Sequence, residues 1–334
     1  MSATAPTTLT TAATPAATPA TLPAPLRLRS MTWAADGVLL LEWVHPHGAA
    51  LPAFEAGAHI DLALADGLSR SYSLCNPPGE TQRYCVAVGL DRHSRGGSRH
   101  VHEQLRPGAL VTVSAPRNHF RLDESAPRFA LLAGGIGVTP ILAMARRLAA
   151  LGKPVELFYA VRSRAAAAFA DELAALVPAL TLHIDTEAGG PPDLAAWLAR
   201  LPRDTGAYCC GPAAMLDGFI SACQRLGLAD AHVERFAAPA STGEATAGCS
   251  LTLQRSGRSI VVTAGTSILD ALLAAGIDHP YSCKEGLCGT CETRVIAGEI
   301  DHRDSVLSPA EQQAGDVMMV CVSGCKGARL VLDL

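Results

Sequence analysis

The sequence predicts a multidomain protein in which an antiparallel β-barrel, an α/β unit with a parallel sheet and a small α+β unit follow one another. Three observations support this fold class. The chain of 334 residues exceeds what one compact core usually accommodates. Its rhythm changes from short strands to alternating strands and helices near residue 125. A small, polar and turn-prone stretch at 238–248 then reads as a linker to a further unit.

The composition is that of an ordinary globular protein. Hydrophobic residues make up 49%, charged residues 17%, and the net charge is -4. A nucleic-acid binder usually shows a strong basic excess, so no nucleic-acid partner is expected. Because charged residues or prolines interrupt every apolar segment, no membrane association is expected either. Residues 1–25, rich in Ala, Thr and Pro, lack the features of a secretory signal and are expected to form a disordered tail.

The first unit is expected at 26–124 and consists of short β-rich runs. They read LRLRSMTW, VLLLEWV, HIDLAL, RSYSL, YCVAV and LVTVS, with Gly, Pro and Asp between them. Closely spaced strands with turn residues between them are typical of a small antiparallel barrel or sandwich.

The second unit is expected at 125–237, where apolar strands alternate with helices and so predict a parallel sheet covered by helices. The strand RFALLA runs into the glycine-rich turn 134–140, with Thr139 as the expected helix cap and Pro140 in the first turn. The strand AYCC ends in a second turn at 209–212, expected on the same sheet edge. Glycines there allow a backbone to approach a pyrophosphate; the alternative is a pair of plain tight turns. The expected dinucleotide contacts are Gly135, Gly137, Thr139, Pro140, Cys210, Gly211 and Pro212.

The third unit, expected at 249–334, carries the strongest signal in the chain. Cys283-x4-Cys288-x2-Cys291 is followed by Cys321 after 29 intervening residues, which is the plant-type spacing for a 2Fe-2S cluster. The alternative is a structural zinc site or scattered buried cysteines. Eleven cysteines, an odd number with this clustering, favour metal ligation in a reducing compartment over disulfides. Cys325 is expected to be a bystander.

Several local strings resemble the phthalate dioxygenase reductase and vanillate O-demethylase reductase family of the ferredoxin-NADP reductase superfamily. These strings are RSYS, SRGGS, APRNHF, LLAGGIGVTPI, YCCGP, VERF, YSCKEGLCGTC and VLDL. The resemblance implies a flavin-binding β-barrel domain, an NAD-binding α/β domain and a C-terminal plant-type ferredoxin domain of the β-grasp type. It also implies FMN instead of FAD.

The RSYS string implies the flavin contacts. In the family, Arg70 would meet the flavin phosphate, Tyr72 would lie against the ring system, and Ser73 would bond near the reactive nitrogen. An anion requires a fork of donors and a flat ring system requires a flat neighbour, so the residue types suit these roles. Gly97 and Ser98, just before the run HVHEQL, offer backbone amides to a phosphate, with a surface loop as the alternative.

Cys210 would sit beside the reacting nicotinamide and, with Ser73, is an expected catalytic residue. A small strand-end residue is the alternative reading of Cys210. Phe236 would stack near the flavin, with plain packing as its alternative. Asn118 and Phe120 belong to the same family pattern without an assigned role.

The choice between NADH and NADPH stays open on the residues themselves. Arg162 and Arg164 could bind a 2′-phosphate, whereas Asp185 could accept a ribose hydroxyl. The family resemblance favours NADH.

The expected function is that of an NADH-dependent reductase component of a Rieske-type aromatic oxygenase or O-demethylase system. A nicotinamide gives two electrons at once and the cluster accepts one, so a flavin is needed between them, and the resemblance implies that it is FMN. The alternatives are a reductase for a cytochrome P450 or di-iron monooxygenase, and a redox-sensing electron carrier without a dedicated oxygenase. The expected location is the cytoplasm.

Overall fold

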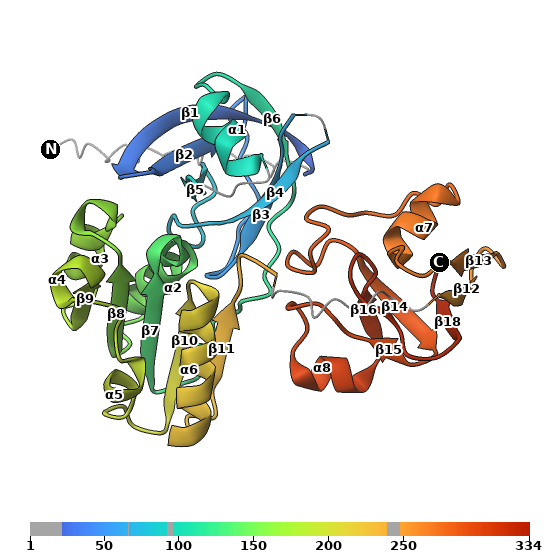
Figure 1. The fold of residues 1–334 in the computed structure, drawn as a ribbon. Helices are drawn as coiled ribbons and strands as arrows, with labels where there is room; N and C mark the ends of the chain where they lie inside the picture. The colour runs from blue at the N-terminus through green and yellow to red at the C-terminus, as the bar shows by residue number, and fades with distance from the viewer. Residues whose placement is uncertain (1–21, 66, 92–95, 239–247) are drawn as a thin grey trace, which may run out of the picture.

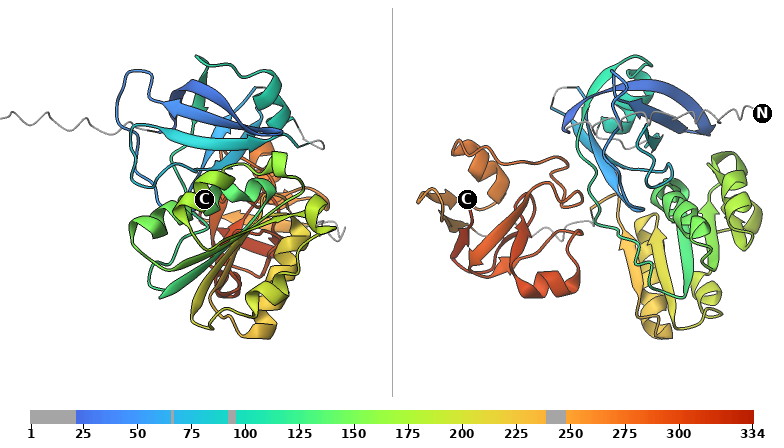
Figure 2. Two further views of the ribbon diagram at one scale, coloured as in Figure 1. Left: turned by 90° about the vertical axis from the view of Figure 1, so that its left-hand side faces the viewer. Right: turned by 180° about the vertical axis from the view of Figure 1, so that it is seen from behind.

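The computed structural model describes residues 22–65, 67–91, 96–238 and 248–334. They form three units, each built on its own main sheet, as Figures 1 and 2 show from three directions. Of the expected tail, residues 1–21 lie outside the described residues, and so do residues 239–247 of the expected linker. None of the described helices is long and apolar enough to cross a membrane.

The first unit is an antiparallel barrel. Its elements are β1 (Ala24–Ala35), β2 (Val38–Val44), β3 (His59–Ala63), β4 (Ser69–Ser73), β5 (Tyr84–Gly89), α1 (Gly97–Glu103) and β6 (Leu110–Val113). The strands lie in the order β4-β3-β6-β1-β2-β5. An isolated bridge between Leu74 and Val86 joins the end of β4 to β5 and closes the sheet. β1 begins at Ala24, before the expected start of the barrel at residue 26.

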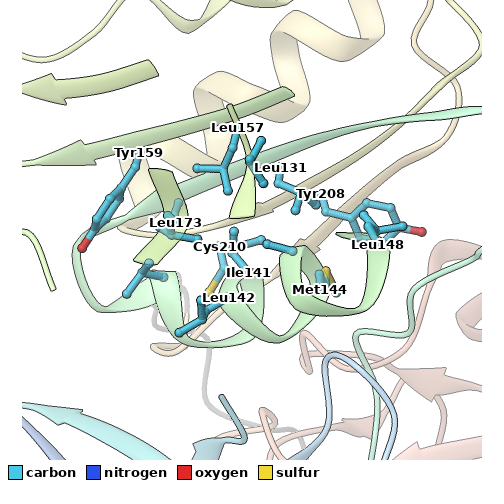
Figure 3. Close-up of a cluster of buried hydrophobic side chains, with 14 of the residues drawn as sticks. Leu131, Ile141, Leu142, Met144, Leu148, Leu157, Tyr159, Leu173, Tyr208 and Cys210 are labelled. Atoms are coloured by element: carbon cyan, nitrogen blue, oxygen red, sulfur yellow. The ribbon is translucent and has the colours of Figure 1, made fainter. Parts of the chain in front are cut away.

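The second unit is a five-stranded parallel sheet between helices. Its elements are β7 (Arg128–Gly134), η1 (Gly135–Gly137), α2 (Val138–Ala150), β8 (Val155–Val161), η2 (Arg164–Ala166), α3 (Ala170–Leu176), β9 (Leu180–Ile184), α4 (Asp185–Ala188), α5 (Leu194–Leu198), β10 (Thr205–Cys210), α6 (Ala213–Leu226) and β11 (Ala231–Glu234). The strand order is β11-β10-β7-β8-β9. Side chains of α2 such as Ile141 and Leu148 pack against Leu131 and Leu157 of the sheet (Figure 3). Helices α5 and α6 cover the other face.

The third unit has a mixed sheet with two short helices. Its elements are β12 (Cys249–Leu253), β13 (Ser259–Val262), α7 (Ile268–Ala274), β14 (Glu292–Ala297), β15 (Ile300–Asp301), α8 (Pro309–Ala314), β16 (Val317–Met319), β17 (Gly324–Cys325) and β18 (Arg329–Leu332). The main sheet runs β13-β12-β18-β14-β16, and β12 and β18 are parallel. The predicted fold class, a barrel followed by a parallel α/β unit and an α+β unit, is confirmed.

Among the described residues, the barrel and the α/β unit share an apolar core cluster, whereas the third unit has a cluster of its own. One core cluster crosses from the barrel into the α/β unit and includes Cys75, Cys85 and Phe120 of the barrel with Val138 and Tyr208. The core cluster of the third unit, among the described residues, draws only on positions 249–334. The barrel and the α/β unit therefore form one packed body, and the third unit lies beside it (Figure 1).

Candidate functional site

The two glycine-containing turns of the α/β unit meet at the carboxyl edge of its sheet. β7 and β10 are parallel neighbours, and Cys210 pairs with Ala133 just before the first turn. A Cβ on Gly137 would lie 2.2 Å from the carbonyl oxygen of Cys210, so only glycine permits this approach. The structure thus brings Gly135 and Gly137 next to the turn formed by Cys210, Gly211 and Pro212.

The start of α2 corrects one expectation about Thr139. The helix begins at Val138, directly after the 3₁₀ turn Gly135–Gly137, so Thr139 lies inside the helix and does not cap it. Its buried hydroxyl donates to the carbonyl of Ile136 at 3.1 Å. The reason is that the 3₁₀ turn continues into the helix without an extended residue at the cap position. Pro140 does lie in the first turn, where its missing N–H leaves no hydrogen bond unmade.

Ser73 and Cys210, the two expected catalytic residues, meet at a third residue, Glu234. The Ser73 hydroxyl lies 3.4 Å from Oε2 of Glu234, across the boundary between the barrel and the α/β sheet. Glu234 ends β11 and is paired in register with Cys210 on β10. Burial, and then the nearby Glu234, raise the pKa of the Cys210 thiol, so this thiol stays neutral.

Glu234 was not among the residues that the sequence pointed to. Desolvation raises its pKa to about 8, although the hydrogen bond from Ser73 opposes that change. The residue keeps some exposed surface, but its carboxyl group is enclosed. A carboxyl with this pKa holds its proton at neutral pH, which marks functional sites more often than plain surfaces. A signal was available, because this carboxylate ends a short strand on the same sheet edge as Cys210.

Arg70 and the start of α1 lie together on the barrel. The Arg70 side chain packs against Gly97, where a Cβ would be 2.6 Å from Cγ of Arg70. Its Nη1 donates to the carbonyl of Ser69 at 2.8 Å. The Ser98 hydroxyl accepts the backbone N–H of Asp91 at 3.2 Å. A guanidinium beside the first turn of a helix offers the donors that a phosphate group requires, so the residues present fit a flavin phosphate.

Two aromatic side chains differ in their surroundings. Tyr72 packs against the barrel core, and burial raises its pKa to about 12, so the ring stays neutral. Phe236 follows β11 and is 42% exposed. Phe236 does not fill a core, which argues against plain packing as its role.

The cations near the expected nucleotide site favour NADH. Nη2 of Arg164 lies 2.8 Å from Oε2 of Glu187 in an exposed ion pair. This carboxylate offsets a charge that a 2′-phosphate would need. Asp185 begins α4 directly after β9, at the carboxyl edge of the sheet, where a ribose hydroxyl acceptor is expected.

The four predicted cluster cysteines come together in two pairs. Cys283 lies within hydrogen-bonding reach of Cys288, and Cys291 within reach of Cys321. Among the described residues, no three Cys, His, Asp or Glu side chains converge in the manner of a single-ion site. Two pairs suit a two-iron cluster, in which each iron takes two thiolates, better than a zinc ion that needs four donors around one point.

The backbone of the cysteine loop also fits such a cluster. The N–H of Glu285 points at Sγ of Cys283 at 3.3 Å, and the hydroxyl of Thr290 lies 3.2 Å from Sγ of Cys288. The hydrogen bond between Cys283 and Cys288 lowers the pKa of Cys288 to about 5 and raises that of Cys283. A backbone donor aimed at sulfur, as the N–H of Glu285 is toward Cys283, stabilises a thiolate, which is the form that binds iron. Cys325 donates instead to the carbonyl of Gly327 at 2.9 Å.

Comparison with known proteins places the whole chain among oxygenase reductases. Residues 251–326 match the model of the 2Fe-2S iron-sulfur cluster binding domain. The chain is 49% identical over 312 residues to phenoxybenzoate dioxygenase subunit beta of Ectopseudomonas oleovorans, covering 92% of this chain and 97% of that protein. It is 42% identical over 315 residues to the vanillate O-demethylase oxidoreductase of Pseudomonas sp. strain HR199, covering 92% and 98%.

Two solved structures share the three-unit arrangement. Phthalate dioxygenase reductase, described as a modular structure for electron transfer from pyridine nucleotides to [2Fe-2S], is 39% identical with a TM-score of 0.68, covering 93% of this chain and 98% of that one. An intact type IV self-sufficient cytochrome P450 monooxygenase is also 39% identical, with a TM-score of 0.86, covering 93% of this chain and 41% of that one.

Proposed function

The chain belongs to the family of phthalate dioxygenase reductase and vanillate O-demethylase oxidoreductase, and from that membership we propose that its electron acceptor is a Rieske-type aromatic oxygenase or O-demethylase. The protein is an NADH-dependent reductase component that uses FMN and a 2Fe-2S cluster. A flavin bound to the barrel would supply the conversion of a two-electron hydride into single electrons for the cluster. Residues of this chain bind and position the nicotinamide, the flavin and the cluster.

One observation carries the proposal: the barrel meets each of the other two units through polar residues. On one side Ser73 meets Glu234 of the α/β unit at 3.4 Å. On the other side Asp61 accepts a hydrogen bond from Thr290, inside the cysteine loop, at 3.3 Å. A flavin held by the barrel would therefore have the nicotinamide site and the cluster site as its neighbours.

The nicotinamide end excludes charge and holds a proton. Gly135 and Gly137, with the turn after Cys210, receive the dinucleotide phosphates at the start of α2. Cys210 presents a neutral thiol, so it adds no anion beside the ring that gives up the hydride. Glu234 keeps a proton on its carboxyl group, which accepts a hydrogen bond from the Ser73 hydroxyl of the barrel. We assign Ser73, Cys210 and Glu234 to this step.

The flavin end uses Arg70, Gly97 and Ser98 for the phosphate and Tyr72 and Phe236 for the ring system. Arg70 supplies a charged fork and α1 supplies backbone N–H groups. The neutral Tyr72 offers a flat surface, and the exposed Phe236 lies at the end of β11 next to the nicotinamide turns.

The remaining assignments concern the cluster, the domains and the cell compartment. We assign the iron ligands to Cys283, Cys288, Cys291 and Cys321. Domain limits of 26–124, 125–237 and 249–334 remain our proposal. Eleven free cysteines and dependence on NADH support the cytoplasm as the place of action.

The test is anaerobic mixing of the purified holoprotein with NADH, followed by absorbance at flavin and cluster wavelengths. We expect the flavin band to bleach first and the cluster band to follow, and we expect NADPH to act much more slowly. Electron delivery is then measured as product formed by a purified Rieske oxygenase with the reductase present. Failure of NADH and NADPH alike to bleach either band would refute the reductase function.

The P450 comparison favours one second candidate. The reductase part of a self-sufficient P450 aligns with nearly the whole chain, so a separate cytochrome P450 is a possible acceptor. Parallel assays with a Rieske oxygenase and a P450 distinguish the two, because only the true acceptor couples NADH oxidation to product.

A further inference from the structure

The third unit is held to the barrel without a shared apolar core. Its core cluster contains only its own residues among those described, in contrast to the core that joins the barrel to the α/β unit. A cleft of about 530 Å³ lies at the junction, lined by barrel residues such as Phe54 and Arg121 and by Gly289 and Glu292 of the third unit. Apolar packing therefore does not explain how the cysteine loop is placed against the barrel.

A partly buried ion pair between Arg117 and Asp61 lies at this cleft, which Arg117 helps to line. Nη2 of Arg117 is 2.5 Å from Oδ2 of Asp61, and Asp61 is buried on β3. The Ser71 hydroxyl donates to the other carboxylate oxygen at 2.6 Å. The backbone of Arg117 is fixed by two hydrogen bonds with His59, at 2.8 and 3.0 Å. Hydrogen bonds within the barrel thus hold the backbone of Arg117 and the carboxylate of Asp61.

The same pair contacts the cysteine loop. Nε of Arg117 donates to the carbonyl of Cys288, one of the predicted iron ligands, at 3.4 Å. The Thr290 hydroxyl donates to Asp61 at 3.3 Å and also lies 3.2 Å from Sγ of Cys288. Between these residues Gly289 packs on His119, where a Cβ would lie 2.2 Å from Nε2 of the imidazole. The contacts join one short stretch, 288–290, to three barrel side chains, those of Asp61, Arg117 and His119.

We infer that Asp61 and Arg117 form a docking pair that positions the cysteine loop on the flavin barrel for electron entry into the cluster. This inference rests on the proposed function. Asp61 and Arg117 are positioning residues, because they act through the loop and not on the nicotinamide. A second contact, between the hydroxyls of Ser69 and Ser282 at 2.8 Å, lies on the other side of Cys283 and limits rotation of the loop.

The experiment compares Arg117→Gln, Asp61→Asn, Thr290→Val and Thr290→Ser in the full-length holoprotein. Thr290→Val replaces the hydroxyl by a methyl group, so the test remains informative if the charge variants fail to fold. Thr290→Ser keeps the hydroxyl donor. The control is Arg255→Gln, which breaks an exposed ion pair with Asp333 elsewhere in the third unit. Each variant is mixed anaerobically with NADH, and flavin and cluster bleaching are timed separately. Hydrogen exchange of the peptide 283–292 is measured by mass spectrometry on the same samples.

We expect flavin bleaching to keep its rate, and cluster bleaching to slow about tenfold to hundredfold in Arg117→Gln and Asp61→Asn, as misplacement by an ångström typically does. Thr290→Val should show the same selective change to a smaller degree, and Thr290→Ser should recover it. Exchange in 283–292 should accelerate in the slowed variants and stay unchanged in Arg255→Gln.

Two results would overturn the inference. One is cluster bleaching at the unmodified rate in Arg117→Gln, Asp61→Asn and Thr290→Val, with unchanged exchange in 283–292. The other is equal slowing of flavin and cluster bleaching, which would indicate general damage to the barrel. Either result is distinct from failure of the proposed function, in which the unmodified protein itself would not bleach with NADH.

Discussion

Replacing Glu234 by glutamine removes a proton from the junction between the barrel and the α/β unit while keeping the shape of the side chain. With a pKa of about 8, this carboxyl is protonated in about nine of ten molecules at pH 7. An ordinary glutamic acid, with a pKa of 4.5, is protonated in fewer than about one in a hundred. Glu234 is therefore the group that stores a proton beside Ser73.

The assay is the rate of anaerobic flavin bleaching at saturating NADH between pH 6 and 9.5. In the unmodified protein the rate should fall as pH rises through about 8, because the proton is lost and an anion forms beside Ser73 and Cys210. Glu234→Gln should lose this inflection and stay close to the low-pH rate of the unmodified protein up to pH 9.5, because glutamine is neutral throughout this range. Glu156→Gln, which breaks an exposed ion pair with Arg200, is the matched control and should keep the inflection.

The raised pKa of Glu234 also determines how the free energy of unfolding changes with pH. Because its folded pKa is raised, the folded chain keeps a proton that the unfolded chain loses between pH 4.5 and about 8. The free energy of unfolding therefore falls as pH rises across that window, by up to about 1.4 kcal/mol per pH unit. Glu234→Gln lacks this loss, so its thermal midpoint should rise relative to the unmodified protein from pH 5 to pH 8.

The reasoning about Glu234 is refuted if Glu234→Gln bleaches its flavin with an inflection still near pH 8. A thermal midpoint difference that does not change between pH 5 and pH 8 would contradict the raised pKa itself.

Three further outcomes are expected. Cys288→Ser should abolish reduction of an acceptor protein yet leave NADH-driven flavin bleaching intact, whereas Cys325→Ser should transfer electrons normally; equal loss of both activities in Cys288→Ser would show that the cluster is not the outlet. Gly137→Ala should weaken NADH binding and lower stability by about 1–3 kcal/mol, since its Cβ would collide with the carbonyl of Cys210. Gly218→Ala, whose Cβ would meet nothing within 4 Å inside α6, should leave NADH binding unchanged and raise the melting temperature slightly, because alanine favours a helix interior by about 1 kcal/mol over glycine. Metal analysis of anaerobically prepared protein should give about two irons and two sulfides per chain, and zinc in their place would exclude electron transfer through this loop.

Local patterns were sufficient for the fold class, and the site residues named from the sequence stay predictions. Strand spacing, the change of periodicity near residue 125 and the cysteine spacing each depend on neighbours in the sequence, so one chain displays them. Thr139 was wrongly expected to cap α2. The residue types do not reveal that Gly135–Gly137 form a 3₁₀ turn that continues directly into the helix at Val138. Helix ends depend on backbone geometry that residue types only partly determine.

The residues that escaped prediction act between units. Asp61 and Thr290 are 229 positions apart, and Ser73 and Glu234 are 161 apart. No periodicity or motif links such positions, and the raised pKa of Glu234 comes from enclosure by surfaces that only the folded chain brings together. Ser73 was expected from the RSYS string, whereas Asp61, Thr290 and Glu234 each looked like an ordinary polar side chain on a strand or loop.

The separate core of the third unit determines how this reductase would fail. Within the described part of the chain, the third unit shares no buried apolar cluster with its neighbours, so heating should produce one transition for the iron-bearing part and another for the remainder. Oxidative loss of the iron would then leave a chain that still consumes NADH but no longer supplies the acceptor. A reductase that has lost its cluster would oxidise NADH without product, so rapid degradation of such damaged chains would save NADH.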